Sequence, residues 1–145
     1  MQAILETKLY RPRLTGDYVP RSRLAAQLEW GLAGRFITLV SAPAGYGKTT
    51  AVVAWLEGMT HAPDAPAVAW YSLDETDDNL SVFVRYLSAA VELAAPGTLA
   101  DLGELLAGPI PLPPVAQIVA LLARDCSHLA RRLILVLDDY HTIGN

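Results

Sequence analysis

The sequence has a single cysteine, Cys126, among its 145 residues. One cysteine excludes an internal disulfide and any zinc site built from several cysteines, which fits a reducing cytoplasm. Charged residues make up only 18% of the chain, and the acidic ones outnumber the basic ones to give a net charge of −4. Lysine and arginine form no stripe that could follow the phosphates of DNA or RNA, so direct contact with nucleic acid is not predicted.

Long apolar runs are also missing. No segment approaches the length of a membrane span, and the N-terminus lacks the continuous apolar stretch of a signal peptide, so we expect a cytoplasmic protein without a membrane partner. The hydrophobic content is nevertheless high, at 52%, which is ample for the core of one domain. A mean hydropathy of +0.29 further suggests that some apolar surface meets other protein.

The most informative stretch runs from Phe36 to Leu56, where an apolar segment gives way to a small-residue loop and then to a helical pattern. Phe36–Val40 is apolar or β-branched throughout, which predicts a strand buried on both faces of a parallel sheet. The loop APAGYGKTT follows directly, and a helix is predicted from Lys48 to about Leu56. A strand, loop and helix in this order are the context of a phosphate-binding loop.

The residue types in this loop suit a bound phosphate. Gly45 and Gly47 allow backbone angles that turn consecutive N–H groups toward an anion, and the N-terminus of the following helix favours negative charge. The ammonium of Lys48 can reach the β- and γ-phosphates, and the hydroxyl of Thr49 can ligate Mg²⁺. The usual spacing G-x-x-x-x-G-K-[ST] has one exception here, because Ala42 replaces the first glycine. Alanine costs little there if its φ is negative.

A second chemical landmark is LILVLDDYH, which spans Leu133–His141. Five apolar residues followed by two aspartates predict a fully buried strand whose C-terminal end presents carboxylates, the position where ligands of open α/β sheets bind. Asp138 is the candidate for holding Mg²⁺, usually through a water, and Asp139 could polarise an attacking water. The alternative for Asp139 is a helix cap or a loop carboxylate.

The remaining pattern predicts alternating helices and strands. Leucine spacing, apolar runs and turn residues predict helices and one further strand between the two motifs and around them. The helices are expected over Ser22–Leu32, Leu80–Ala94, a short segment around Leu99–Leu106 and Val115–Leu129, and the strand over Val68–Leu73. Cys126 lies on the apolar face of the last helix and is expected in the core.

Two charged clusters have both a structural and a functional interpretation. The basic residues of the N-terminal arm form either a solvated positive face or a group near nucleotide phosphates; they are Lys8, Arg11, Arg13, Arg21 and Arg23. The acidic cluster DETDDN, Asp74–Asn79, could assist a metal site. Capping of the next helix by Asp78 or Asn79 explains part of it more simply.

Taken together, four segments resemble one known family. They are VPRSRL at Val19–Leu24, LVSAPAGYGKTT, WYSLDETDDN and LVLDDYH. In this combination they are similar to the nucleotide-binding domain of MalT-like, LuxR-family ATP-dependent transcriptional regulators, which are STAND-class P-loop NTPases. The resemblance spans nearly the whole chain. In this family the loop commonly begins with a small residue other than glycine, so Ala42 agrees with it.

The resemblance implies an α/β fold, a three-layer α/β/α P-loop NTPase with a parallel sheet, of which this chain holds the N-terminal portion. Residues 1–35 would form an arm and first helix, and residues 36–145 a nucleotide-binding core that stops after the second motif strand. The implied cofactors are ATP or ADP and Mg²⁺. The implied site residues comprise the nucleotide-binding loop Ala42, Pro43, Ala44, Gly45, Tyr46, Gly47, Lys48, Thr49 and Thr50, the adenine contacts Val19, Pro20 and Arg21, the Mg²⁺ ligands Thr49 and Asp138, and the catalytic residues Lys48 and Asp139.

The function implied by the resemblance is an ATP·Mg²⁺-binding switch with slow ATP hydrolysis in the intact protein. Sensor, helical-repeat and DNA-binding parts would follow Asn145, self-association would accompany activation, and hydrolysis by this portion alone would be negligible. A strand later in sequence would separate Phe36–Val40 from Leu133–Leu137 in the sheet. Two other interpretations remain open, a P-loop kinase or other phosphotransferase and an inactive fragment that binds no nucleotide.

Overall fold

A computed structural model describes residues 4–34, 37–60, 62–108 and 111–144. The chain forms two compact units. Unit 1 consists of Met1–Tyr10 together with Pro66–Asn145, and unit 2 consists of Arg11–Ala65. The second motif strand therefore belongs to unit 1 and the glycine-rich loop to unit 2, and each is described within its own unit.

Unit 1 is built on two parallel strands, β1 (Ala67–Ser72) and β2 (Leu133–Asp138). The register runs from Ala67 opposite Leu133 to Ser72 opposite Asp138, so both strands end at the same edge of the sheet. The strands predicted over Val68–Leu73 and Leu133–Leu137 are confirmed, each to within one residue. Apolar and β-branched residues dominate them, as in strands that are covered by other elements.

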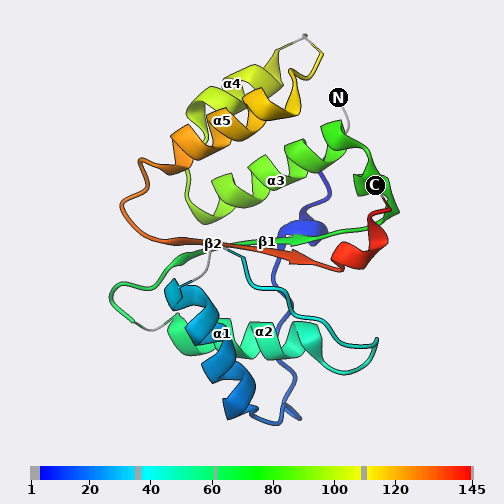
Figure 1. The fold of residues 1–145 in the computed structure, drawn as a ribbon, viewed down its shortest axis with the longest axis vertical. Coiled ribbons are helices and arrows are strands. Elements are labelled where there is room, and N and C mark those ends of the chain that lie inside the picture. Colours follow the sequence, from blue (N-terminus) through cyan, green and yellow to red (C-terminus); the bar gives the residue numbers. More distant parts are fainter. Residues whose placement is uncertain (1–3, 35–36, 61, 109–110, 145) are drawn as a thin grey trace. The chain divides into compact units, whose positions relative to one another are not determined.

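Three helices lie on one side of this sheet (Figure 1). Helix α3 (Leu80–Ala94) packs against β1, and the antiparallel pair α4 (Ala100–Ala107) and α5 (Val115–Cys126) packs beyond it. The bounds of α3 are as predicted, whereas α5 ends at Cys126, three residues before the predicted Leu129. A short 3-10 turn, η1 (Glu6–Leu9), also packs against β1. The core between these elements contains Tyr71, Val84, Val91, Leu99, Leu102 and Ile118.

Burial corrects three details of the predicted core. The apolar face of α5 includes Val115, Ile118 and Val119, of which Ile118 is buried while Val115 and Val119 are exposed. Strand β2 is partly exposed rather than fully buried, because β1 is its one hydrogen-bonded neighbour in the described part of the chain. Cys126 is half-buried against the core rather than within it, and burial raises the pKa of its thiol. The apolar pattern also missed Asp125, which is buried and accepts a hydrogen bond from the backbone N–H of Leu102 at 3.0 Å.

Unit 2 contains two helices that pack together, α1 (Ser22–Gly34) and α2 (Lys48–Met59). Both helices were predicted, although each runs two or three residues further than expected. Gly31 on α1 gives the following segment room, since a Cβ there would lie 2.5 Å from the Thr38 hydroxyl oxygen. The segment can therefore approach α1 this closely because residue 31 is a glycine, which has no Cβ.

The strand predicted over Phe36–Val40 is not found in the described residues. Phe36 lies outside them, and Ile37–Val40 has no regular secondary structure and is exposed, with Ile37 at 86% and Leu39 at 82%. A strand needs a hydrogen-bonded neighbour, and the sheet in the described part of the chain contains β1 and β2 alone. The apolar sequence without such a neighbour therefore does not form a strand.

Candidate functional site

The glycine-rich loop of unit 2 has the backbone that its sequence predicts. Gly45 and Gly47 have φ angles of 80° and 75°, in the left-handed region that glycine enters without steric cost. Within the described residues Asp139 is the only non-glycine residue with a positive φ, so Ala42 has a negative φ as expected. The substitution of Ala42 for glycine is therefore compatible with the loop.

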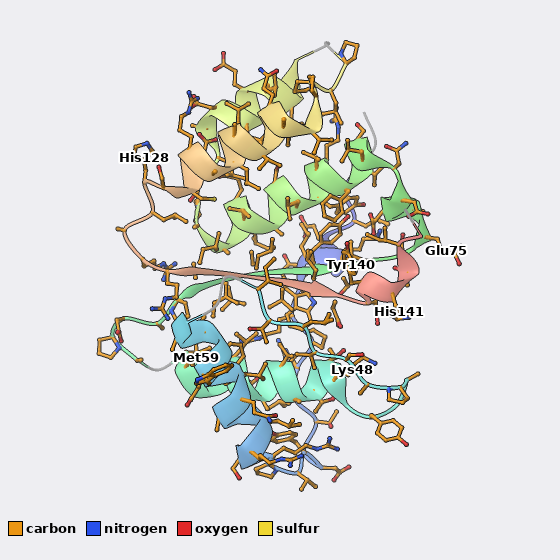
Figure 2. The ribbon with its side chains drawn as sticks, in the orientation of Figure 1. Lys48, Met59, Glu75, His128, Tyr140 and His141 are labelled. Atoms are coloured by element: carbon orange, nitrogen blue, oxygen red, sulfur yellow. The ribbon has the colours of Figure 1, made fainter. Side chains whose placement is uncertain are left out.

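Lys48 begins helix α2 and folds back over the loop (Figure 2). Its Nζ donates to the carbonyl oxygens of Ala42 at 2.7 Å and Pro43 at 3.3 Å. The backbone N–H of Tyr46 also donates a hydrogen bond to the carbonyl oxygen of Pro43, at 3.4 Å. The ammonium group thus lies at the loop whose N–H groups and helix N-terminus would attract an anion. Gly47 occupies the N-cap and supplies no capping side chain.

Of the three residues expected near the adenine, one contacts the loop. Nη1 of Arg21 donates to the carbonyl oxygen of Tyr46 at 3.2 Å. Val19 and Pro20 are exposed, Val19 at 72%. Adenine binding by these three residues stays a prediction.

In unit 1 the two aspartates lie at the C-terminal end of β2. Asp138 is the last residue of β2, and one of its carboxylate oxygens accepts from the N–H of Asp139 at 3.1 Å. Asp139 has φ 56° and precedes the 3-10 turn η3 (Tyr140–Thr142), but its exposed side chain does not cap that turn. Figure 2 shows Tyr140 and His141 on this turn, at the same end of the sheet as Glu75. The proposed roles of both aspartates stay predictions.

The acidic cluster after β1 is organised by capping, as its simpler interpretation predicts. The Asn79 side chain accepts from the N–H groups of Ser81 and Val82 at the start of α3. Asp74 and Asp77 form a capping box around the 3-10 turn η2 (Glu75–Asp78). In the described residues no group of three or more His, Cys, Asp or Glu side chains could hold a metal ion.

Sequence reasoning missed the partner of this cluster, Lys8. Its Nζ lies 2.7 Å from a carboxylate oxygen of Asp74 and 2.9 Å from one of Asp77, and 4.9 Å from the centre of the Tyr86 ring. Asp77 is fully buried and also accepts from the Tyr71 hydroxyl at 2.6 Å. The network fastens the N-terminal arm to the turn after β1. No sequence signal pairs residues about 70 positions apart, so only the capping-box spacing could have been recognised.

The Lys8 network predicts a pH dependence of stability. Hydrogen bonds from Lys8 and then Thr76 lower the pKa of Asp74 to about 2, below its ordinary value of 3.8. The stabilisation by ionised Asp74 is therefore complete above about pH 4 and is lost as the pH falls through about 2. Between pH 5 and pH 2, the thermal unfolding midpoint of Asp74→Asn should fall less than that of the wild type. The exposed neighbour Glu75→Gln is the control, and equal pH profiles for Asp74→Asn and the wild type would contradict this assignment.

Comparisons with known proteins point to one family of regulators. No protein-family model matches the chain. Over 142 residues, which are 98% of its length, the chain is 37% identical to the HTH-type transcriptional regulator MalT of Cronobacter sakazakii and 38% identical to that of Serratia proteamaculans. The matching protein of Yersinia pestis is 36% identical over the same length. The chain spans 15% of the length of each of these relatives.

The chain also contains no helix long and apolar enough to cross a membrane within its described residues.

The similarity to MalT covers the loop, the acidic turn and the strand that ends in two aspartates, because it extends over 98% of the chain. The resemblance that these motifs indicate is therefore confirmed: the chain is similar over nearly its whole length to one part of the MalT transcriptional regulators.

Proposed function

We propose that this chain is the nucleotide-binding part of an ATP-dependent switch in a MalT-like transcriptional regulator. The observation that carries the proposal is the glycine-rich loop at the N-terminus of α2, with two glycines at positive φ and the Lys48 ammonium folded over it. Positive φ angles at nearby glycines turn backbone N–H groups toward a common centre, which suits a phosphate. The similarity to MalT supports the regulatory context.

The residues of the loop fit a nucleotide. At Gly45 nothing lies within 4 Å of the position that a Cβ would occupy, so that side of the loop is open to a ligand. The N–H groups of the loop and the first turn of α2 would bind the phosphates, and Lys48 would exchange its carbonyl partners for phosphate oxygens. Thr49, at the start of α2, would be a ligand of the Mg²⁺ that neutralises charge on the phosphates when bound. Asp138 of unit 1 is proposed as a Mg²⁺ ligand on the family resemblance alone.

The switch would act through ATP occupancy and slow hydrolysis. Asp139 would accept a proton from the attacking water, because a carboxylate next to the metal-binding residue can serve as a general base. Occupancy would be reported to other parts of the regulator, where an inducer, self-association and DNA binding would be located. These steps rest on the residues of the two motifs and on the family resemblance that they carry, and the similarity to MalT supports the transcriptional context.

Replacement of the loop lysine tests the proposal directly. We expect Lys48→Ala to weaken ATP affinity by about 1.5–3 kcal/mol, since a charge-assisted contact to phosphate is lost. Calorimetric titration of ATP with and without Mg²⁺ measures the change. Arg85→Ala removes the same charge from an exposed position on α3 and is the matched control.

Two results would overturn the proposal. Equal ATP affinities for the wild type and Lys48→Ala would remove the phosphate-loop interpretation. The absence of any ATP binding by the wild-type chain, with and without Mg²⁺, would favour the interpretation as an inactive fragment.

A further inference from the structure

We propose that Arg21 is a positioning residue that braces the phosphate loop from outside, rather than a residue that recognises the adenine. The inference rests on the proposed nucleotide site and assigns a task to one residue of it. Nη1 of Arg21 lies 3.2 Å from the carbonyl oxygen of Tyr46, and Nη2 lies 3.8 Å from the position that a Cβ on Gly47 would occupy. Tyr46 stands between the two glycines with positive φ. The guanidinium therefore contacts the middle of the loop.

The contact controls the direction of one backbone amide. In a trans peptide the C=O and N–H bonds point to opposite sides, so holding the Tyr46 carbonyl also fixes the direction of the Gly47 N–H. Gly47 is the N-cap of α2, and its N–H belongs to the group that would bind phosphate. Gly47 has no Cβ to restrict its φ, so without this contact the peptide between Tyr46 and Gly47 would rotate more freely. Arg21 thus orients the Gly47 amide before the nucleotide arrives.

Arg21 is itself held in place. Its backbone N–H donates to the hydroxyl oxygen of Tyr18 at 3.4 Å, and its carbonyl oxygen accepts from the N–H groups of Leu24 and Ala25 at the start of α1. Lys48 secures the beginning of the loop through Ala42 and Pro43, and Arg21 secures its middle. Two cations from different helix starts of unit 2 therefore bind loop carbonyls, which leaves the opposite sides of those peptides for an anion.

A ligand without a base separates this assignment from adenine recognition. We expect Arg21→Ala to weaken the binding of tripolyphosphate and of ATP by the same factor, about three- to tenfold, because the loop rather than the base contact is affected. If Arg21 recognised the adenine instead, Arg21→Ala would weaken the binding of ATP and leave the affinity for tripolyphosphate unchanged. Titration of both ligands by calorimetry against the chain in Mg²⁺ buffer gives the two ratios.

Two further variants complete the test. Arg85→Ala removes the same charge at an exposed position of α3 and should leave both affinities unchanged. Arg21→Lys keeps a donor and should recover at least half of the lost binding free energy. A direct contact of Arg21 with phosphate predicts a weaker salt dependence of tripolyphosphate binding in Arg21→Ala, whereas positioning predicts the wild-type salt dependence.

The outcomes distinguish this inference from the proposed function. If the wild type binds neither ligand, the nucleotide site itself is wrong and the inference falls with it. The other outcomes concern Arg21 alone, in a wild type that binds both ligands. The positioning role is wrong if Arg21→Ala weakens the binding of ATP only, weakens the binding of neither ligand, or changes the salt dependence of tripolyphosphate binding. A thermal unfolding midpoint equal to that of the wild type shows that the Arg21→Ala result comes from the loop rather than from misfolding.

Discussion

Asp139→Asn is expected to slow ATP hydrolysis by about 10²- to 10⁴-fold while ATP affinity changes little, because a general base acts on the attacking water and not on the bound nucleotide. The substitution is well suited to this site. Asp139 has a φ of 56°, and asparagine is the residue after glycine that enters this region most readily. Its exposed side chain does not cap η3, so no cap is lost. Single-turnover hydrolysis is the measurement, in a chain that includes the complete nucleotide-binding domain of the family.

The neighbouring aspartate supplies the comparison. Asp138 ends β2, and we expect Asp138→Asn to reduce the affinity for ATP in the presence of Mg²⁺ far more than in its absence, because a metal contact is weakened. Titrations with and without Mg²⁺ measure this difference. If the two variants show the same combination of affinity and rate, the division of roles between the aspartates is wrong.

Asp77→Ala is expected to destabilise unit 1 by about 3–5 kcal/mol, the loss that follows when one partner of a buried ion pair is removed. Asp77 is fully buried, and it accepts from Lys8 at 2.9 Å, from the Tyr71 hydroxyl at 2.6 Å and from the N–H of Asp74 at 2.8 Å. Its removal leaves the largely buried ammonium of Lys8 with the partly exposed Asp74 and leaves the Tyr71 hydroxyl without its acceptor. Burial and this hydrogen bond also raise the pKa of Tyr71.

Chemical denaturation followed by circular dichroism measures the change in the free energy of unfolding. Glu75→Ala removes an exposed carboxylate from the same turn and should change this free energy by less than about 0.5 kcal/mol. A loss for Asp77→Ala as small as that for Glu75→Ala would show that the network does not hold the arm on the sheet.

The predictions that hold are those encoded by neighbouring residues. The spacing of apolar residues predicts both ends of α3, and Asn79 before its first residue is a helix cap in sequence and in structure. The loop around Gly45 and Gly47 is equally local, because glycine enters the left-handed region at little cost whatever surrounds it. Patterns with a period of 3.6 residues or a fixed cap position need no information from distant parts of the chain.

The predictions that fail depend on what lies beside a segment. Ile37–Val40 has the sequence of a buried strand but forms none, and β2 is only partly buried. Apolar composition supplies the side chains of a strand, whereas its backbone groups need a neighbouring strand that a local pattern cannot specify. The exposed Val115 and Val119 on α5 show the same limit for a helix face, since a stripe does not say how much of it a partner covers.

The sequence by itself determined the glycine-rich loop, the helix that follows it, the apolar strand ending in Asp138 and Asp139, and the family that these motifs indicate, because each is carried by residues close together in the chain. Only the tertiary structure decided that Lys8 joins the acidic turn some 70 residues away, that the buried Asp125 of α5 accepts from the N–H of Leu102 in α4, and that Arg21 contacts the loop at Tyr46. These contacts arise from packing, which brings a charged group next to a partner from another element. The interaction with that partner offsets the free-energy cost of removing the charge from water.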